Sequence, residues 1–199
     1  MLKLNYKKLL IKKNKIPITC LTAYSKPIAN ILDGKVDLIL VGDSLGTTLF
    51  GMQNTRGVTI EMMKNHGKTV VQNTKYSMTI IDMPYNTYRN KSEALKNAID
   101  ILTFTKADFI KIETDKKNIN IVEHLTKNKI KVVSHIGVTP QKFSNFSKIK
   151  SVGKNIKDTN NLLNLAKKLE GAGSKMIVLE CISLDTSKKI TNSLSIPTI

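Results

Sequence analysis

Apolar, β-branched runs recur along the chain and are separated by segments with helical spacing. Each run is almost continuously hydrophobic, which is typical of strands that are covered on both faces. Strands that alternate with helices predict parallel βα units and an α/β fold. Six runs are complete and a seventh is cut off by the last residue; they lie at 17–24, 38–44, 78–84, 109–113, 131–137, 175–181 and 196–199.

Four of the segments between these runs combine apolar residues at helical spacing with a helix-start signal. The third is expected to end at Gly171, and the fourth must end before Pro197. No linker-like or low-complexity stretch interrupts the pattern, so residues 1–199 are predicted to form a single domain. The expected N-caps are Thr59, Ser92, Asp158 or Thr159, and Asp185 or Thr186.

The chain is strongly basic, with a net charge of +17 and an isoelectric point near 9.8. Only Arg56 and Arg89 are arginines, and the lysines are spread through every predicted helix. Arginine is the better reader of phosphates and base edges. Lysine, asparagine and isoleucine have AT-rich codons, so compositional drift is favoured over specific nucleic-acid binding as the source of the charge. A basic nucleic-acid-binding module is kept as an alternative.

Three features predict a cytoplasmic protein without a membrane partner. The amino-terminal segment alternates lysines with single leucines and lacks the apolar core of a signal peptide. No apolar stretch approaches the ~20 residues that a membrane span needs. Cys20 and Cys181 fall inside apolar runs and are interpreted as buried, reduced thiols, so nothing indicates an oxidising compartment.

Ionisable side chains gather where the predicted strands end. In α/β barrels and open α/β sheets, the carboxyl ends of the strands are where sites are built. Four carboxylates at one rim would repel one another and need a cation, a proton or a lysine between them. The residues at these strand ends are Asp43, Ser44, Asp82, Lys111, Glu113, His135 and Glu180.

The acids among these residues predict a magnesium site. Mg²⁺ takes oxygen ligands, keeps several waters and uses one or two carboxylates together with substrate oxygens. Asp43 and Asp82, with Glu113 bound directly or through water, would supply them. The histidines are too scattered for a zinc site. The alternative, that each acid only caps the loop or helix that follows it, remains open.

Ser44 lies in a GDSL stretch, which is also the nucleophile motif of a class of esterases. Those enzymes need a histidine base with an orienting acid, often as D-x-x-H, and this chain contains no such motif. A serine without a base is a weak nucleophile. Ser44 is therefore interpreted as a hydrogen-bond donor to a substrate oxygen, with Gly42 and Gly46 allowing close approach of the backbone.

At the level of whole motifs, the sequence resembles the ketopantoate hydroxymethyltransferase family. The motifs appear in the order and spacing of the family and cover nearly the whole chain. Within them, the turn VGDSLG alone is less specific, because barrel enzymes of the isocitrate lyase and phosphoenolpyruvate mutase group carry similar turns. The shared stretches are TAY (22–24), LILVGDSLG (38–46), VTIEMMKNH (58–66), IDMPY (81–85), IKIE (110–113), SHIGVTPQ (134–141) and IVLEC (177–181).

The resemblance implies a Mg²⁺-dependent (β/α)8 barrel. It would transfer a one-carbon unit from 5,10-methylenetetrahydrofolate to 3-methyl-2-oxobutanoate through a metal-stabilised enolate, and would assemble as a homo-oligomer, in this family a decamer. By motif, Asp43, Asp82 and Glu113 would bind the metal and Glu180 would accept the proton. The implied substrate-binding residues are Asp43, Ser44, Asp82, Lys111 and His135.

Two departures from the family pattern stand out. Ser25 follows the TAY motif where the family usually has aspartate, and the chain stops at IPTI where the family continues into two further strands and a last helix. About six and a half of the eight βα units are expected here, so we expect either a fragment of a longer protein or a truncated gene product. The alternatives are a related Mg²⁺-dependent carbon–carbon lyase and a non-catalytic remnant.

Overall fold

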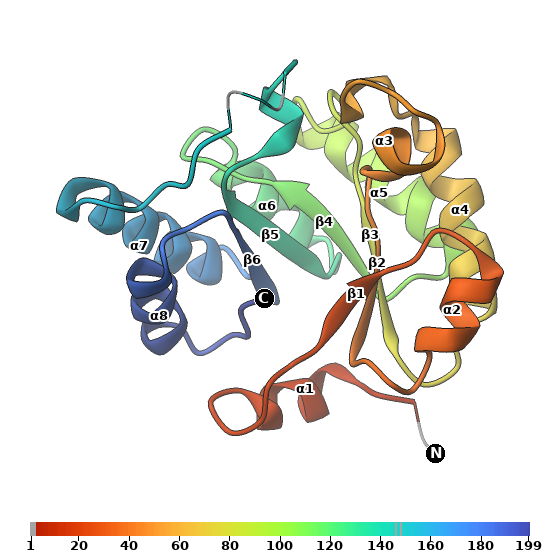
Figure 1. The fold of residues 1–199 in the computed structure, drawn as a ribbon, viewed down its shortest axis with the longest axis horizontal. Helices are drawn as coiled ribbons and strands as arrows, with labels where there is room; N and C mark the ends of the chain where they lie inside the picture. Colours follow the sequence, from red (N-terminus) through yellow and green to blue (C-terminus); the bar gives the residue numbers. More distant parts are fainter. Residues whose placement is uncertain (1–2, 146, 148) are drawn as a thin grey trace.

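The computed structural model describes residues 3–145, 147 and 149–199 and contains one curled, all-parallel sheet (Figure 1). Its six strands pair in chain order, each with the next, and helices pack on the outer face of the curl. Strands of this kind need helical crossovers between them, as the alternating pattern of the sequence predicts. The strands are β1 (Cys20–Thr22), β2 (Leu38–Val41), β3 (Met78–Asp82), β4 (Phe109–Glu113), β5 (Val132–Gly137) and β6 (Met176–Glu180).

Every complete apolar run contains one of these strands, so the predicted α/β fold with a parallel sheet is confirmed. The seventh run also lies where a further parallel strand would pair. The backbone N–H of Ile177 donates to the carbonyl of Pro197 at 3.1 Å, and that of Ile199 donates to the carbonyl of Ile177 at 3.0 Å. Residues 196–199 therefore extend the sheet beyond β6.

Eight α-helices and two short 3-10 helices connect or flank the strands within the described residues. Four of them, α1, α2, α3 and α6, were not predicted from the sequence. The helices are α1 (Tyr6–Lys12), α2 (Lys26–Leu32), α3 (Leu45–Leu49), η1 (Thr55–Gly57), α4 (Ile60–Gln72), α5 (Lys91–Thr105), α6 (Ile119–Lys127), η2 (Pro140–Lys142), α7 (Ile156–Gly171) and α8 (Leu184–Ser193).

The predicted helix starts are partly right. Thr59 caps α4, its side chain accepting from the N–H of Met62 at 3.2 Å. The prediction that Ser92 caps α5 was wrong, because Asn90 takes that role and its side-chain oxygen accepts from the N–H of Glu93 at 2.9 Å. Asparagine is at least as good an N-cap as serine, so the earlier residue starts the helix.

The same residue type begins α7. Asn155 accepts from the N–H of Asp158 at 2.8 Å, which corrects the prediction of Asp158 or Thr159 as the cap. The helix ends at Gly171 as predicted. Helix α8 begins at Leu184 rather than after Asp185 or Thr186, and it ends before Pro197 as expected. An aspartate in the first turn still favours these helices through the helix dipole.

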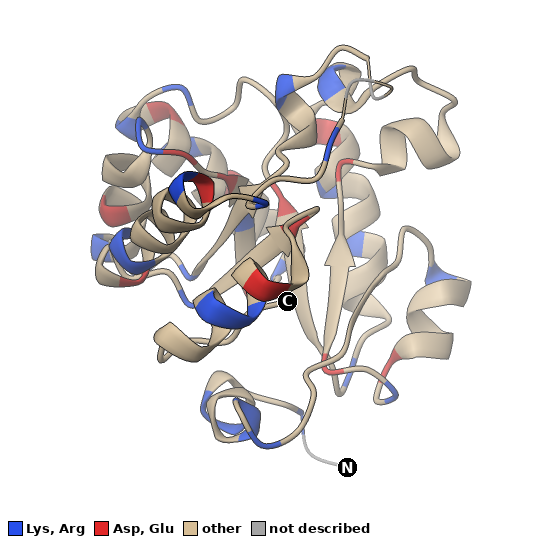
Figure 2. Cartoon of the chain, turned by 60° about the vertical axis from the view of Figure 1, so that its left-hand side comes forward, with Lys and Arg blue, Asp and Glu red and all other residues tan. Residues whose placement is uncertain are grey.

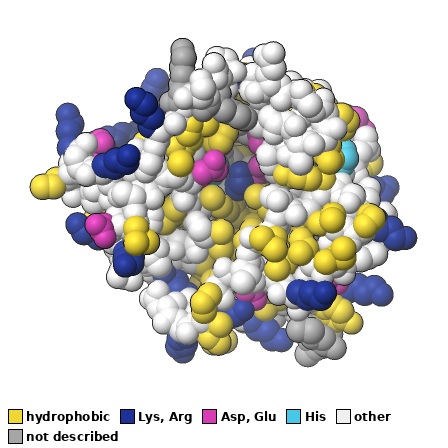
Figure 3. Space-filling model, in the orientation of Figure 1, with side chains coloured by type: hydrophobic (Ala, Val, Ile, Leu, Met, Phe, Trp, Pro, Cys, Tyr) yellow, Lys and Arg dark blue, Asp and Glu magenta, His cyan; other side chains and the backbone are white. Residues whose placement is uncertain are grey.

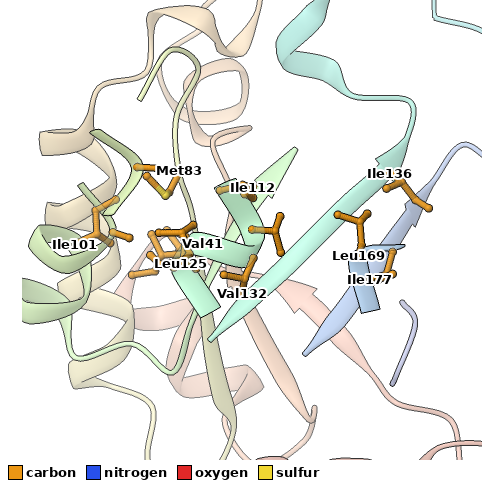
Figure 4. Close-up of a cluster of buried hydrophobic side chains, with 14 of the residues drawn as sticks. Val41, Met83, Ile101, Ile112, Leu125, Val132, Ile136, Leu169 and Ile177 are labelled. Atoms are coloured by element: carbon orange, nitrogen blue, oxygen red, sulfur yellow. The ribbon is translucent and has the colours of Figure 1, made fainter. Parts of the chain in front are cut away.

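Two hydrophobic clusters lie on opposite faces of the sheet. The larger one joins the outward-facing strand residues to the helices, and Figure 4 shows Val41, Ile112 and Ile177 among its members. The smaller cluster fills the inside of the curl at the amino ends of the strands. Helix α1 closes it from below (Figure 1). Its fully buried members are Leu9, Leu38, Met78, Ile80, Phe109, Val133 and Met176.

Helix α1 is tied to the sheet by long-range contacts. The Tyr6 hydroxyl donates to the carbonyl of Lys175 at 2.8 Å, and its ring packs edge-on against Phe109 with centroids 6.2 Å apart. Lys12 pairs with Asp37 at 2.6 Å. Lys7 and Lys8 are exposed, and Leu9 alone is fully buried. One buried leucine is too weak a signal to predict a helix from local sequence.

The two cysteines differ in their surroundings. Cys20 is partly buried in β1, whereas Cys181 is exposed, so the prediction of a buried thiol was wrong for Cys181. The apolar run ends with β6, and Cys181 turns the chain outward with a left-handed backbone (φ 55°). Neither cysteine forms a disulfide within the described chain. In residues 3–145, 147 and 149–199, no helix is long and apolar enough to cross a membrane.

Candidate active site

The carboxyl ends of the strands surround a cavity of about 380 Å³. Acidic and basic side chains gather in this recess between hydrophobic ones (Figure 3), and acidic segments lie at the tips of the strands (Figure 2). All seven residues singled out from the sequence line it: Asp43, Ser44, Asp82, Lys111, Glu113, His135 and Glu180.

Strand geometry places these side chains on one surface. Successive strand residues alternate between faces, so a residue two positions after an inward-facing apolar residue also faces inward. Asp82, Lys111 and His135 each follow a member of the inner cluster by two residues. Parallel register then sets Asp82 beside Lys111 and Glu113 beside His135. Neighbouring strands therefore deliver the ionisable groups side by side.

Lys111 and Asp82 form a buried ion pair, with Nζ 2.8 Å from Oδ1. Burial by itself would lower the pKa of Lys111, but the carboxylates of Asp82 and Asp43 outweigh it and hold that pKa above its ordinary value. Lys111 therefore remains a cation in the middle of the cavity. One lysine balances only part of the negative charge that the strand ends bring together.

Asp43 is buried at the end of β2. Its Oδ2 accepts from the Nε2 of Gln141 at 2.7 Å, and its backbone N–H donates to Oδ2 of Asp82 at 3.1 Å. Burial, followed by the nearby charge of Asp82, raises the pKa of Asp43 to about 6. The positive charges near Asp43 therefore do not fully compensate the negative charge of its carboxylate.

Burial raises the pKa of Glu113 further than that of Asp43. Its Oε1 accepts from the backbone N–H of Gln141 at 3.0 Å, and its Oε2 is buried with no hydrogen-bond partner among the described residues. Burial raises the pKa of Glu113 to about 8. A carboxyl group in this position either binds a proton or needs a cation, because an unpaired buried charge is costly.

The donor set fits a hard divalent cation. Asp43, Asp82 and Glu113 supply only oxygen atoms, and Lys111 leaves part of their charge uncompensated. Among the described residues, no three His, Cys, Asp or Glu side chains already lie close enough to ligate one ion together. Mg²⁺ commonly uses one or two carboxylates and keeps water in its other positions. The cavity therefore suits a partly hydrated Mg²⁺ better than a fully protein-bound metal.

On the other side of the cavity, His135 is paired with Glu180. Nε2 lies 3.0 Å from Oε2; the imidazole is buried, whereas the Glu180 side chain is 44% exposed. Burial, together with the charge of Lys111, lowers the pKa of His135. Burial is the largest single influence and would raise the pKa of Glu180, but the contact with His135 and the charges of His135 and Lys111 together outweigh it and lower that pKa. Both shifts favour a neutral histidine beside an ionised glutamate.

Ser44 has a tyrosine and no histidine as its side-chain partner. Its Oγ lies 2.7 Å from the hydroxyl of Tyr24, and either oxygen can donate. Within the described chain no imidazole is hydrogen-bonded to Ser44, so the arrangement of a serine esterase is not formed. The serine faces the cavity as a hydrogen-bonding group.

The two glycines around Ser44 serve different purposes. A Cβ at Gly42 would lie 2.9 Å from the Oγ of Ser44, so a side chain there would crowd the site. At Gly46 a Cβ would come within 2.6 Å of Val58 and 3.0 Å of Met52. Gly46 is thus needed for packing in the connection from β2 to α4, and its expected role in letting the backbone approach a substrate stays a prediction.

Comparison with known proteins adds to this geometry. The family model for ketopantoate hydroxymethyltransferase matches residues 3–199.

The chain belongs to the ketopantoate hydroxymethyltransferase family.

Curated relatives named 3-methyl-2-oxobutanoate hydroxymethyltransferase agree with this membership. The protein from Pelagibacter ubique is 50% identical over 94% of this chain and 72% of its own length. Those of Rhizobium etli and Aliarcobacter butzleri are each 39% identical, over 92% and 99% of this chain and 67% and 73% of their own lengths. This ketopantoate hydroxymethyltransferase family member thus spans about 70% of these relatives' lengths.

Solved structures resemble the family member in fold. A phosphonopyruvate hydrolase aligns over all of this chain and 71% of its own, with a TM-score of 0.72 and 11% identity. A 2,3-dimethylmalate lyase of the PEP mutase/isocitrate lyase superfamily covers 97% of this chain and 69% of its own, with a TM-score of 0.67 and 12% identity. The likeness to these lyases and hydrolases is one of fold.

Several residues that shape the site of this ketopantoate hydroxymethyltransferase family member were not assigned a role from the sequence. Gln141 contacts two of the acids, and the hydroxyl of Tyr88 donates to its Oε1. Thr55 lines the cavity with a buried hydroxyl that has no partner among the described residues. Gln141 is the last residue of the SHIGVTPQ motif and follows the end of β5. Its position after a strand end was the one sequence signal that could have indicated a role in the site.

Proposed function

We propose that the protein transfers a hydroxymethyl group from 5,10-methylenetetrahydrofolate to 3-methyl-2-oxobutanoate, giving 2-dehydropantoate. The single observation that carries the proposal is the cavity, which gathers every residue that the family motifs assign to this reaction. The curated relatives named for the activity support it at up to 50% identity. The lyase alternative is supported only by structures of 8–12% identity, which speak for the fold.

Asp43 and Asp82 would hold a Mg²⁺ ion, and Glu113, which lines the same cavity, would bind it directly or through one of its waters. When bound, this ion polarises the carbonyl of the 2-oxo acid and makes its C3 hydrogen more acidic. Lys111, kept charged between the acids, orients the negative oxygens of the substrate. The hydroxyl of Ser44 donates a hydrogen bond to a substrate oxygen while Tyr24 holds its side chain in place.

Glu180 is the proposed base. Its ionised state follows from the lowered pKa, and its partly exposed carboxylate faces the cavity from β6, across from the acids of β2 and β3. His135 Nε2 lies 3.0 Å from Oε2 of Glu180, and we propose that the other carboxylate oxygen takes the C3 proton of the substrate. The buried imidazole thereby fixes the direction of the base.

The finer structural predictions are proposals as well. We propose a (β/α)8 barrel for the complete family fold, supported by the curl of the sheet and by the pairing of residues 196–199 beside β6. The folate co-substrate, the homo-oligomer and the metal belong to the same proposal.

Proton abstraction can be tested without folate. In D₂O, 3-methyl-2-oxobutanoate should exchange its C3 hydrogen for deuterium in the presence of the protein and Mg²⁺, as followed by NMR. Adding 5,10-methylenetetrahydrofolate should then release tetrahydrofolate and form 2-dehydropantoate. Absence of both exchange and transfer would contradict the proposed function. Cleavage of a 2-hydroxy dicarboxylic acid in place of transfer would favour the lyase alternative.

A further inference from the structure

We infer that Gln141 is a positioning residue of this site, which holds Asp43 and Glu113 in the arrangement that receives the cation and the 2-oxo acid. The inference rests on the proposed function and extends it to a residue outside the predicted set. Gln141 lies in η2, after β5, and is buried. It is separated from Asp43 by 98 positions in the chain.

All the polar groups of the Gln141 side chain are engaged. Nε2 donates to Oδ2 of Asp43 at 2.7 Å and to the carbonyl of Met83 at 3.0 Å. Oε1 accepts from the hydroxyl of Tyr88. The reverse orientation of the amide would set its oxygen against a carboxylate and a carbonyl, so the contacts fix which atom faces Asp43.

The backbone of Gln141 adds a further link, because its N–H donates to Oε1 of Glu113 at 3.0 Å. One residue thus joins the polypeptide after β2 and β3 to the end of β4, from the loop that follows β5. The contact with Gln141 occupies Oδ2, one of the two carboxylate oxygens of Asp43, while Asp43 itself lines the cavity. Gln141 therefore sets both the spacing and the orientation of the two acids.

Arg56 holds Gln141 from the outer side. Its Nε donates to the carbonyl of Gln141 at 3.0 Å, and its Nη2 donates to the carbonyl of Lys142 at 2.9 Å. The guanidinium also lies over the ring of Tyr85, 4.8 Å from the centroid. The planar fork of arginine suits two neighbouring carbonyls, which a lysine cannot bind in the same way. The connection between β2 and α4 is thereby fastened to the loop after β5.

The main test compares Gln141→Met and Gln141→Glu with the parent chain. Methionine keeps the size of the side chain but removes its hydrogen bonds, and glutamate sets a carboxyl group against Asp43. Calorimetry with Mg²⁺ and 3-methyl-2-oxobutanoate should show a Kd raised roughly tenfold to a hundredfold for Gln141→Met, the range for a hydrogen bond to a charged group. Gln141→Glu should raise Kd further.

Kinetics separate positioning from a general loss of structure. In the deuterium-exchange assay, KM for the 2-oxo acid should rise by the same factor as Kd. The kcat at saturation should stay within about threefold, because the hydrogen bonds of Gln141 within the described residues go to Asp43, Met83, Glu113, Tyr88 and Arg56 and to neither Glu180 nor His135. A merely structural role would instead lower the thermal unfolding temperature and kcat together at an unchanged Kd. That pattern, or an unchanged Kd and KM, would overturn the inference.

Arg56→Lys provides a second variant should Gln141 be needed for folding. It should also raise Kd, by a smaller factor than Gln141→Met. An unchanged Kd would count against the role of Arg56 in holding Gln141 in place. Arg89→Lys is the matched control, because Arg89 pairs with Glu93 on the exposed surface and should leave binding unaltered. A parent chain that neither binds nor exchanges the 2-oxo acid would reject the proposed function itself. If the parent, Gln141→Met and Gln141→Glu all bind the 2-oxo acid with the same Kd, only the role of Gln141 is rejected.

Discussion

The inside of the curled sheet has two ends of opposite character, although the same strands build both. At the amino end, Ile80, Phe109 and Val133 belong to a hydrophobic cluster that α1 closes from below (Figure 1). Two residues further along the same strands, the inward positions are Asp82, Lys111 and His135. The change from core to site takes place within a single alternation of the strand.

The difference shows how the fold separates stability from chemistry. The amino end buries apolar side chains and secures the register of the strands. The polar end buries carboxyl groups whose charged forms are disfavoured, as the raised pKa values of Asp43, about 6, and Glu113, about 8, indicate. Substitutions at the two ends should therefore affect different quantities.

The largest effect is expected at the amino end. Phe109→Ala should lower the free energy of unfolding by about 3–5 kcal/mol, because it removes a fully buried ring from a packed cluster. Urea denaturation measures the change. Phe50→Ala is the matched control, since that ring is 51% exposed and its loss should cost far less. Equal costs for the two variants would mean that the inner cluster does not support the sheet.

At the polar end, Glu180→Gln should lower the rate of the reaction and leave the stability of the fold almost unchanged. Deuterium exchange at C3 of 3-methyl-2-oxobutanoate is expected to fall by about 10²-fold or more, because the amide cannot accept the proton. The free energy of unfolding should change little, since the side chain is 44% exposed. Exchange that persists at the parent rate would assign the proton transfer to His135 or another group.

Asp43→Asn should separate binding from stability. The affinity for 3-methyl-2-oxobutanoate in the presence of Mg²⁺ is expected to fall about tenfold or more, as a charged oxygen ligand is lost. Without metal, the variant should melt at a higher temperature than the parent at pH 7, because the raised pKa means that the charged carboxylate destabilises the fold. Lower affinity together with lower stability would contradict this second expectation.

The pH dependence of Glu113 gives the smallest effect for a change of one pH unit. Its folded pKa of about 8 lies above the ordinary value of 4.5, so the folded state binds more protons than the unfolded state between these values. Stability without metal should therefore fall as the pH rises through this window, by no more than about 1.4 kcal/mol per pH unit for one proton. Glu113→Gln should flatten the dependence, as thermal unfolding across a pH series would reveal; a slope of the same size in that variant would assign it elsewhere.

Much of the fold could be predicted because its signals are local. Each of the six complete apolar runs contains a strand, and the polar residues after the runs converge on one cavity because parallel strands end at the same edge. The cap of α4 at Thr59 is equally local. Helices α5 and α7 begin earlier than predicted, because Asn90 and Asn155 take the N-cap positions. This signal is also local, since asparagine is a favourable N-cap residue.

The amino-acid sequence by itself determined the order of strands and helices and the acidic and basic residue types available at the strand ends. Only the tertiary structure decided which face of each strand points inward, since both faces are apolar and the sequence shows no alternation. It also decided that α1 closes the amino end through Leu9, and that Gln141 bridges to Asp43 across 98 positions. Such contacts join residues far apart in the chain and leave no local pattern, because they exist only once the sheet has curled and brought its strand ends together.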